Sequence, residues 1–208
     1  MRLIVGMTGA TGAVLGIRLL HALRSLAVET HLVLSQWARA TIEMETGYSV
    51  REVHALADHV YSARDQAAAI SSGSFRTDGM VVIPCSMKTL AAIRTGYGEG
   101  LIARAADVTI KEHKPLILVP REMPLSVIHL ENMLALARMG VVMAPPAPAF
   151  YQRPASVEDI IDHIVARVLD QLGLELPGIS RWPGPTGQDR PTARQRHDTE
   201  GGSCAAAV

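Results

Sequence analysis

The sequence predicts a doubly wound α/β domain, in which helices cover both faces of a parallel sheet. Short runs of apolar residues alternate along the chain with longer amphipathic segments, and the runs contain almost no polar residue. Strands of this kind must be buried on both faces, which is typical of parallel sheets. A glycine-rich turn directly after the first run adds to this prediction, and 208 residues suffice for one domain.

Hydrophobic periodicity gives the individual elements in order. The predicted strands are residues 2–5, 30–34, 80–83, 116–119 and 141–143. The predicted helices are residues 11–26, 36–45, 99–111, 125–138 and 157–172, with a further helix starting near residue 87. The chain therefore begins βαβα, and we expect a single domain over residues 1–182.

The composition excludes several classes of function. Lys plus Arg number 20 and Asp plus Glu number 20, so no general attraction to nucleic acid or to an anionic membrane is expected. Aromatic residues make up only 4% of the chain, which argues against a stacking platform for single strands. We find no membrane-spanning stretch, no export signal, no metal-binding motif and no cysteine framework. The sequence therefore predicts a soluble cytoplasmic protein without a metal site.

The composition changes near the carboxyl terminus. Residues 183–208 are rich in Gly, Pro, Thr, Gln, Arg and Asp, with almost no large apolar side chain. Such a segment cannot bury enough surface to offset its ordering entropy. We expect it to be a disordered tail.

A glycine-rich turn follows the first strand. Gly6, Gly9 and Gly12 are spaced by three residues and lead into a helix, which is the setting of a phosphate-binding turn. The spacing is not the GxGxxG of dinucleotide sites, and the second strand ends in Ser35 where a ribose-binding acid is usual. The hydroxyls of Thr11 and Ser35 suit a phosphate or the polar edge of a flavin. The alternative is a turn that needs small residues only for packing.

Two further loops end strands at the same predicted edge. Residues 84–89 offer hydroxyls, a lysine and helix amides. Cys85 within them is interpreted as structural or merely adjacent to a flavin, and not as a nucleophile, because no base lies beside it. Arg121 and Glu122 follow the next strand between two prolines and could bind an anion and carry a proton. As an isolated dipeptide they could equally be a solvated surface pair.

A proline-rich loop at residues 145–151 ends in Phe150 and Tyr151, and it could hold an aromatic wall or serve only as a connection. His129 lies in a leucine-rich helix and is interpreted as structural. Neither Glu45 nor Arg167 would by itself indicate a functional site.

Taken together, these segments resemble the flavin prenyltransferases, small flavoproteins once described as subunits of aromatic acid decarboxylases. The resemblance runs from residue 2 to residue 182. It rests on GMTGATGA, LVLS, METG, ISSGSFRTDGMVVIPCSMKTLA, RAADV, LVPREMPLS, HLENM, PPAPAFY and VARVLDQ. It implies a Rossmann-like or flavodoxin-like sheet. His113 stands where the family commonly has Arg, which could alter a subunit contact.

The resemblance also implies the roles of individual residues. The expected FMN contacts are Gly9, Ala10, Thr11, Ser35, Ser86, Met87, Lys88, Thr89 and Arg121. Lys111, Arg121, Tyr151 and Arg167 would surround the phosphate of dimethylallyl phosphate, and Trp182 would line the prenyl pocket. Glu122 and Glu45 would handle protons, so that Glu122, Glu45, Lys111 and Arg121 form the expected catalytic set.

The activity implied is transfer of a dimethylallyl group to N5 and C6 of reduced FMN. The prenylated FMN would serve a partner decarboxylase of hydroxyaryl or phenolic acids, and the subunits would form a homo-dodecamer. Two alternatives are a non-catalytic FMN-binding accessory subunit and a flavin-dependent decarboxylase of cysteine-type substrates. An accessory subunit that only binds FMN would not need the second phosphate site that the resemblance implies. The second is expected to have an early-helix histidine and an Asn-rich loop, and we find neither here.

Overall fold

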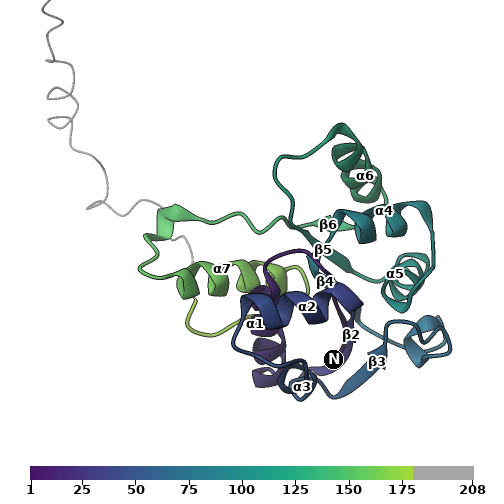
Figure 1. Ribbon diagram of the computed structural model, residues 1–208, viewed down its shortest axis with the longest axis horizontal. Helices are drawn as coiled ribbons and strands as arrows, with labels where there is room; N and C mark the ends of the chain where they lie inside the picture. Colours follow the sequence, from purple (N-terminus) through teal and green to yellow (C-terminus); the bar gives the residue numbers. More distant parts are fainter. Residues whose placement is uncertain (180–208) are drawn as a thin grey trace, which may run out of the picture.

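The computed structural model describes residues 1–179 and contains a six-stranded sheet in the order β3-β2-β1-β4-β5-β6 (Figure 1). The strands are β1 (Arg2–Met7), β2 (Glu29–Leu34), β3 (His59–Ser62), β4 (Gly79–Cys85), β5 (Leu116–Pro120) and β6 (Val142–Met143). Every pair of neighbouring strands is parallel. This is the doubly wound Rossmann order, whose ligand crevice lies where the order reverses, here between β1 and β4.

Helices cover both faces of the sheet, as the sequence predicts. They are α1 (Ala13–Ser25), α2 (Gln36–Glu45), α3 (Val50–His54), α4 (Met87–Thr95), α5 (Leu101–Lys111), α6 (Val127–Arg138) and α7 (Val157–Asp170), with 3-10 turns η1 (Ala69–Ser71) and η2 (Phe150–Gln152). Figure 1 shows α1 and α7 on one side of the strands and α4, α5 and α6 on the other.

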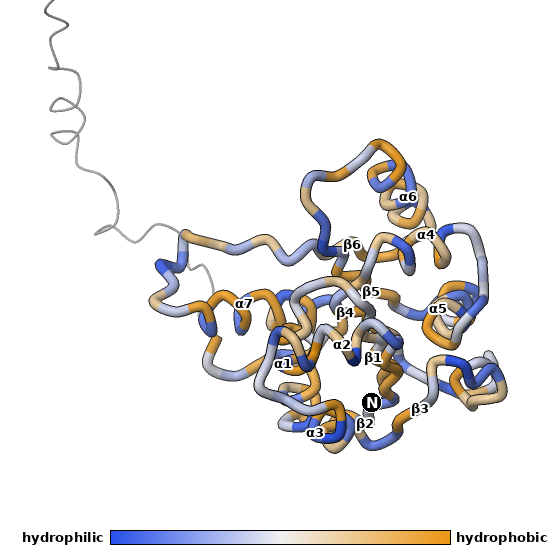
Figure 2. The backbone as a smooth tube through the Cα atoms, viewed as in Figure 1, coloured by the Kyte–Doolittle hydropathy of each residue, from blue (hydrophilic) through white to orange (hydrophobic). Residues whose placement is uncertain are grey.

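Each face has its own hydrophobic cluster. The first joins the sheet to α1, α2 and α7 through residues such as Leu19, Leu20 and Val165, and the second joins it to α4 and α5 through residues such as Leu90 and Ala106. The central strands are apolar on both sides (Figure 2), which is why they read as continuous apolar runs.

Several predicted boundaries are corrected by one or two residues. The first helix starts at Ala13 and not at residue 11, because Gly12 adopts a left-handed conformation, φ 99°, that ends the turn. The sixth helix starts at Val127, because the Ser126 side chain accepts a hydrogen bond from the N–H of His129. His129 in turn accepts from the Ser126 N–H at 3.2 Å, which is the structural role expected of it.

The sequence did not predict α3, β3 or η1. The strand β3 is an edge strand whose four residues are mostly exposed, so it lacks the continuous apolar run by which the other strands are found. α3 has five residues, too few to show a helical period, although its capping box of Ser49 and Glu52 is a recognisable signal. No helix among the described residues is long and apolar enough to cross a membrane.

Candidate functional site

Thr8 ties together the loops that follow β1 and β4. Its hydroxyl donates to the Pro84 carbonyl at 2.8 Å and accepts from the Ser86 N–H at 2.7 Å, and the side chain is 1% exposed. The Ser35 N–H bonds to the Met7 carbonyl, and the Arg121 N–H bonds to the Cys85 carbonyl. The structure therefore brings together the loops of β1, β2, β4 and β5, as the parallel topology predicts.

A cleft of about 780 Å³ opens at these strand ends, on the face covered by α4 and α5. Five of the predicted FMN contacts line it: Gly9, Ser35, Ser86, Lys88 and Thr89. The segment after β3 and the connection between α4 and α5 complete the wall, with Arg64, Gln66, Tyr97 and Leu101. Its size and mixed polar and apolar walls suit a small organic cofactor.

Four other predicted FMN contacts lie beside the cleft and not in its wall. Ala10 is buried, Thr11 is exposed, and Met87 packs against the second hydrophobic cluster. Arg121 follows β5, and its Nε is buried without a hydrogen-bond partner among the described residues. A buried guanidinium N–H that lacks an acceptor is costly, so this group is suited to an anion.

Gly9 is required by the close approach of Trp37, the second residue of α2. A Cβ at Gly9 would lie closer than 3.0 Å to the Trp37 Cβ and 3.3 Å from two of its backbone atoms. Trp37 lines the cleft and is 70% exposed. The turn therefore has a packing reason for its glycine and also forms a wall of the cleft, so the two interpretations of the turn are compatible.

Glu45 caps the first helix. Its Oε2 accepts from the N–H groups of Gly12 at 2.8 Å and Ala13 at 3.1 Å. Partial burial would raise the pKa of Glu45, but these bonds, one from the Thr11 hydroxyl and the charge of Arg121 together lower it. The carboxylate therefore occupies the helix amides that a phosphate would otherwise use.

Glu122, next to Arg121, is exposed, and its Oε1 accepts from the Met123 N–H at 3.1 Å. The carboxylate is thus oriented by the backbone at the carboxyl end of β5. It lies in the same loop as the guanidinium, as the sequence predicts.

Lys111 lies away from the cleft in this chain. It is the last residue of α5, which leads to the amino end of β5, whereas the cleft lies at the carboxyl ends of the strands. The Nζ is ion-paired with Glu112, and both groups face Gly73.

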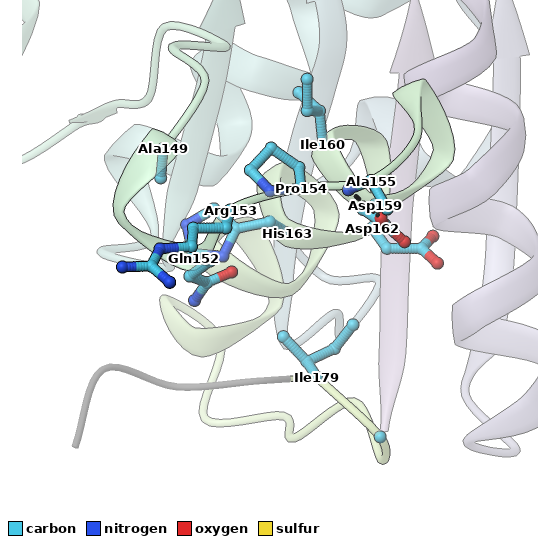
Figure 3. A pocket seen from close by; sticks show the side chains of 11 residues that line it. Ala149, Gln152, Arg153, Pro154, Ala155, Asp159, Ile160, Asp162, His163 and Ile179 are labelled. Atoms are coloured by element: carbon cyan, nitrogen blue, oxygen red, sulfur yellow. Dashed lines mark hydrogen bonds between the residues drawn. The ribbon is translucent and has the colours of Figure 1, made fainter. Parts of the chain in front are cut away.

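Tyr151 of η2 and Arg167 of α7 form a further group on the opposite face of the sheet. The Tyr151 ring meets the His163 ring edge-on at 6.1 Å, and Arg167 is one helical turn beyond His163. Arg167 is ion-paired with Asp170 at 2.6 Å. Beside this group lies a smaller cavity of about 290 Å³. Figure 3 shows the residues that line it, among them Gln152, Arg153 and His163. One chain thus presents three separate groups of predicted site residues.

Sequence reasoning missed Thr8 and Trp37. Thr8 lies inside the glycine-rich turn, whose interpretation rests mainly on its glycines. A hydroxyl at the end of a strand is itself a sign of a hydrogen bond to a neighbouring loop. Cys85 is fully buried, and burial raises the pKa of its thiol to about 12, which fits the structural role expected of it. Trp182 and the predicted tail 183–208 lie outside the described residues.

The chain is similar to known flavoproteins over most of its length. The family model described as Flavoprotein matches residues 1–169. A UbiX-like flavin prenyltransferase from Escherichia coli O157:H7 is 69% identical over 185 residues, which is 88% of this chain and 94% of that protein.

Two solved structures are similar in fold and sequence. The crystal structure of a dodecameric FMN-dependent UbiX-like decarboxylase from Escherichia coli O157:H7 has a TM-score of 0.87 and 69% identity, covering 89% of this chain and 100% of that one. The structure of AnUbiX (PadA1) in complex with FMN and dimethylallyl pyrophosphate has a TM-score of 0.88 and 57% identity, covering 89% and 98%. Because identity of this level extends over nearly the whole described fold, the chain belongs to the family of UbiX-like flavin prenyltransferases.

Proposed function

We propose that this protein transfers a dimethylallyl group from dimethylallyl phosphate to N5 and C6 of reduced FMN. Family membership supports this function, and the single structural observation that carries it is the cleft lined by the loops that follow β1, β2, β3 and β4, of which Thr8 ties the first to the last. Of two relatives, one is described with FMN and dimethylallyl pyrophosphate and the other as FMN-dependent.

The residues present fit FMN. Gly9 lines the cleft without a side chain, so its backbone is open to a ligand there, and the buried Nε–H of Arg121 lacks an acceptor in the described part of the chain. Ser35, Ser86, Lys88 and Thr89 would supply uncharged donors and one cation along the cleft. The Glu45 carboxylate would keep the first-helix amides occupied, so the flavin phosphate would depend on the remaining loop donors and on Arg121.

The chemistry needs charge stabilisation more than a strong base. When bound, reduced FMN would supply the nucleophilic N5 and C6 atoms. Loss of phosphate from an allylic carbon builds negative charge on the leaving oxygen, which Lys111, Arg121 and Arg167 would stabilise. The Tyr151 hydroxyl would donate to the same oxygens. Glu122, oriented by the Met123 N–H, would take up the proton released as the new bonds form.

We further propose that neighbouring subunits complete this site. In one chain Lys111 lies toward the amino ends of the strands and Tyr151 and Arg167 lie on the α7 face, so neither group faces the cleft. A relative is described as dodecameric. In such an assembly, a homo-dodecamer of this chain, the cleft of one subunit would meet the α5 end and the α7 surface of others.

Anaerobic turnover tests the activity. The purified protein is mixed with FMN, a reductant and dimethylallyl phosphate, and the extracted flavin is analysed by mass spectrometry. We expect a mass gain of one five-carbon prenyl unit. Glu122→Gln should bind FMN but slow this gain, whereas Glu131→Gln, on an exposed face of α6, is the matched control. Tightly bound but unmodified FMN, with either the monophosphate or the diphosphate, would instead identify an accessory subunit.

Co-assembly of two inactive variants tests the shared site. Lys111→Ala and Arg121→Ala remove groups that would come from different subunits of one site. Differently tagged variants, co-expressed and purified through both tags, should recover part of the activity that each lacks alone. Mixed oligomers that remain as inactive as the two separate variants would contradict the shared site.

The product is proposed to serve a decarboxylase of hydroxyaryl or phenolic acids. Extracted product should activate such an apo-decarboxylase, while FMN treated in the same way without dimethylallyl phosphate should not. A cysteine-type decarboxylase would instead release carbon dioxide from a cysteine-terminated peptide in the presence of oxidised FMN.

The reducing cytoplasm would suit both the reduced flavin and the unpaired Cys85 thiol.

A further inference from the structure

Three side chains that commonly bind metals meet near the amino ends of β2 and β3, whereas the cleft lies at the carboxyl ends of the strands. Glu29 and His31 belong to β2, and His59, the first residue of β3, is paired in register with His31. Glu29 Oε1 lies 3.0 Å from His31 Nε2 and 3.6 Å from His59 Nε2. One ligand atom from each residue lies within 4.8 Å of the other two. These residues lie at the amino ends of the strands, so the cluster is separate from the flavin site.

The spacing suits a small tetrahedral ion. Bonds of about 2.0–2.1 Å to zinc place neighbouring ligand atoms about 3.3–3.4 Å apart. The two distances from Glu29 Oε1 lie on either side of this value. The rings of His31 and His59 are stacked with centroids 4.5 Å apart, so one ring must turn before both Nε2 atoms can point at one ion. His59 is 52% exposed and is free to make that rotation.

The contacts around the two residues of β2 also suit a metal. Arg2 and His31 both bond to Glu29 Oε1, which holds the carboxylate toward the cluster. The Tyr61 hydroxyl lies 2.8 Å from His31 Nδ1. In the metal-free chain His31 Nε2 is hydrogen-bonded to Glu29 Oε1, and a bound ion would take the place of that proton. An Nδ1–H that donates to Tyr61 would then hold the ring, which is the usual outer-shell arrangement of histidine ligands.

We propose that Glu29, His31 and His59 bind one divalent transition metal ion, with Zn²⁺ the best fit. Two imidazoles and a carboxylate, with water in the fourth position, form a common open zinc set. Arg2 is the main opposing group, because its Nε lies 2.8 Å from Glu29 Oε1. Its positive charge weakens binding of a cation, so we expect micromolar affinity. The ion would fasten the exposed edge strand β3 to β2.

Calorimetric titration of the full-length protein with Zn²⁺ tests this site. The chain is treated with a chelator and used in a Cys204→Ser background, so that the second cysteine cannot contribute a thiolate. We expect one equivalent of Zn²⁺ per chain, and a His59→Ala change should weaken binding about tenfold or more. His21→Ala, which removes a half-buried histidine of α1 far from the cluster in the sequence, is the matched control and should leave binding unchanged.

Two further measurements keep the result clear if a variant is destabilised. Co²⁺ in place of Zn²⁺ should give the visible absorption of a tetrahedral site, and His59→Gln should abolish it while FMN affinity stays at the parent level. Zn²⁺ should raise the melting temperature of the parent protein but not of His59→Ala. Equal Zn²⁺ binding by the parent and His59→Ala, or no binding by the parent, would overturn the proposal. Neither result bears on flavin prenylation, which uses the other end of the sheet.

Discussion

Adding one methyl group at Gly9 should disturb the flavin cleft more than the rest of the fold. The new Cβ would lie under 3.0 Å from the Trp37 Cβ, whereas ordinary contacts of this kind are 3.4–4 Å. The turn or the start of α2 must therefore shift by roughly 1 Å. Overpacking of this kind costs about 1–3 kcal/mol. If that cost falls on the shape that binds FMN, the affinity should drop roughly 5- to 150-fold.

Titration of FMN, followed by quenching of its fluorescence, measures this effect in Gly9→Ala. Gly47→Ala is the matched control, because nothing lies within 4 Å of a Cβ at that glycine. In a Trp37→Gly background the clashing Cβ is absent, so Gly9→Ala should cost much less there than in the parent. Equal FMN affinity and equal melting temperature for Gly9→Ala and Gly47→Ala would refute the reasoning.

Three further predictions concern single side chains. Thr8→Val should lower the free energy of unfolding in urea by about 1–3 kcal/mol, because the Ser86 N–H loses its acceptor. Thr8→Ser keeps a hydroxyl and should retain most of the parent stability. Equal stability of the two variants would contradict this. Cys85 should resist alkylation at pH 8 in the folded Cys204→Ser protein, since burial raises its pKa to about 12, and rapid labelling would show that the strand end opens. Because the folded-state pKa of Glu45 is lowered, its cap stabilises the protein at neutral pH and is lost as the pH falls through that pKa. Glu45→Gln should therefore flatten the loss of stability at acid pH, and an unchanged acid profile would remove the cap from this account.

The sequence predicted the strands of the sheet that are buried on both faces, because burial on both faces leaves a continuous apolar run. It could not predict β3, whose residues are mostly exposed and which is held at the edge by pairing with β2. The sequence also predicted that the loops after the strands lie together, since the carboxyl ends of parallel strands lie at the same end of the sheet. It did not predict that Lys111 lies near the other end, because α5 carries the chain back across the sheet before β5.

The position of Glu45 narrows the chemistry that each carboxylate can perform. A carboxylate that accepts from two helix amides, and whose pKa is lowered, is a poor proton donor at neutral pH and a weak base. Its protonation would also leave the first helix without its acceptor for those amides. Glu122 accepts only one backbone N–H and is exposed beside Arg121, so no helix end depends on its carboxylate. We therefore propose that Glu122 transfers the proton in the proposed reaction and that Glu45 holds the glycine-rich turn in shape.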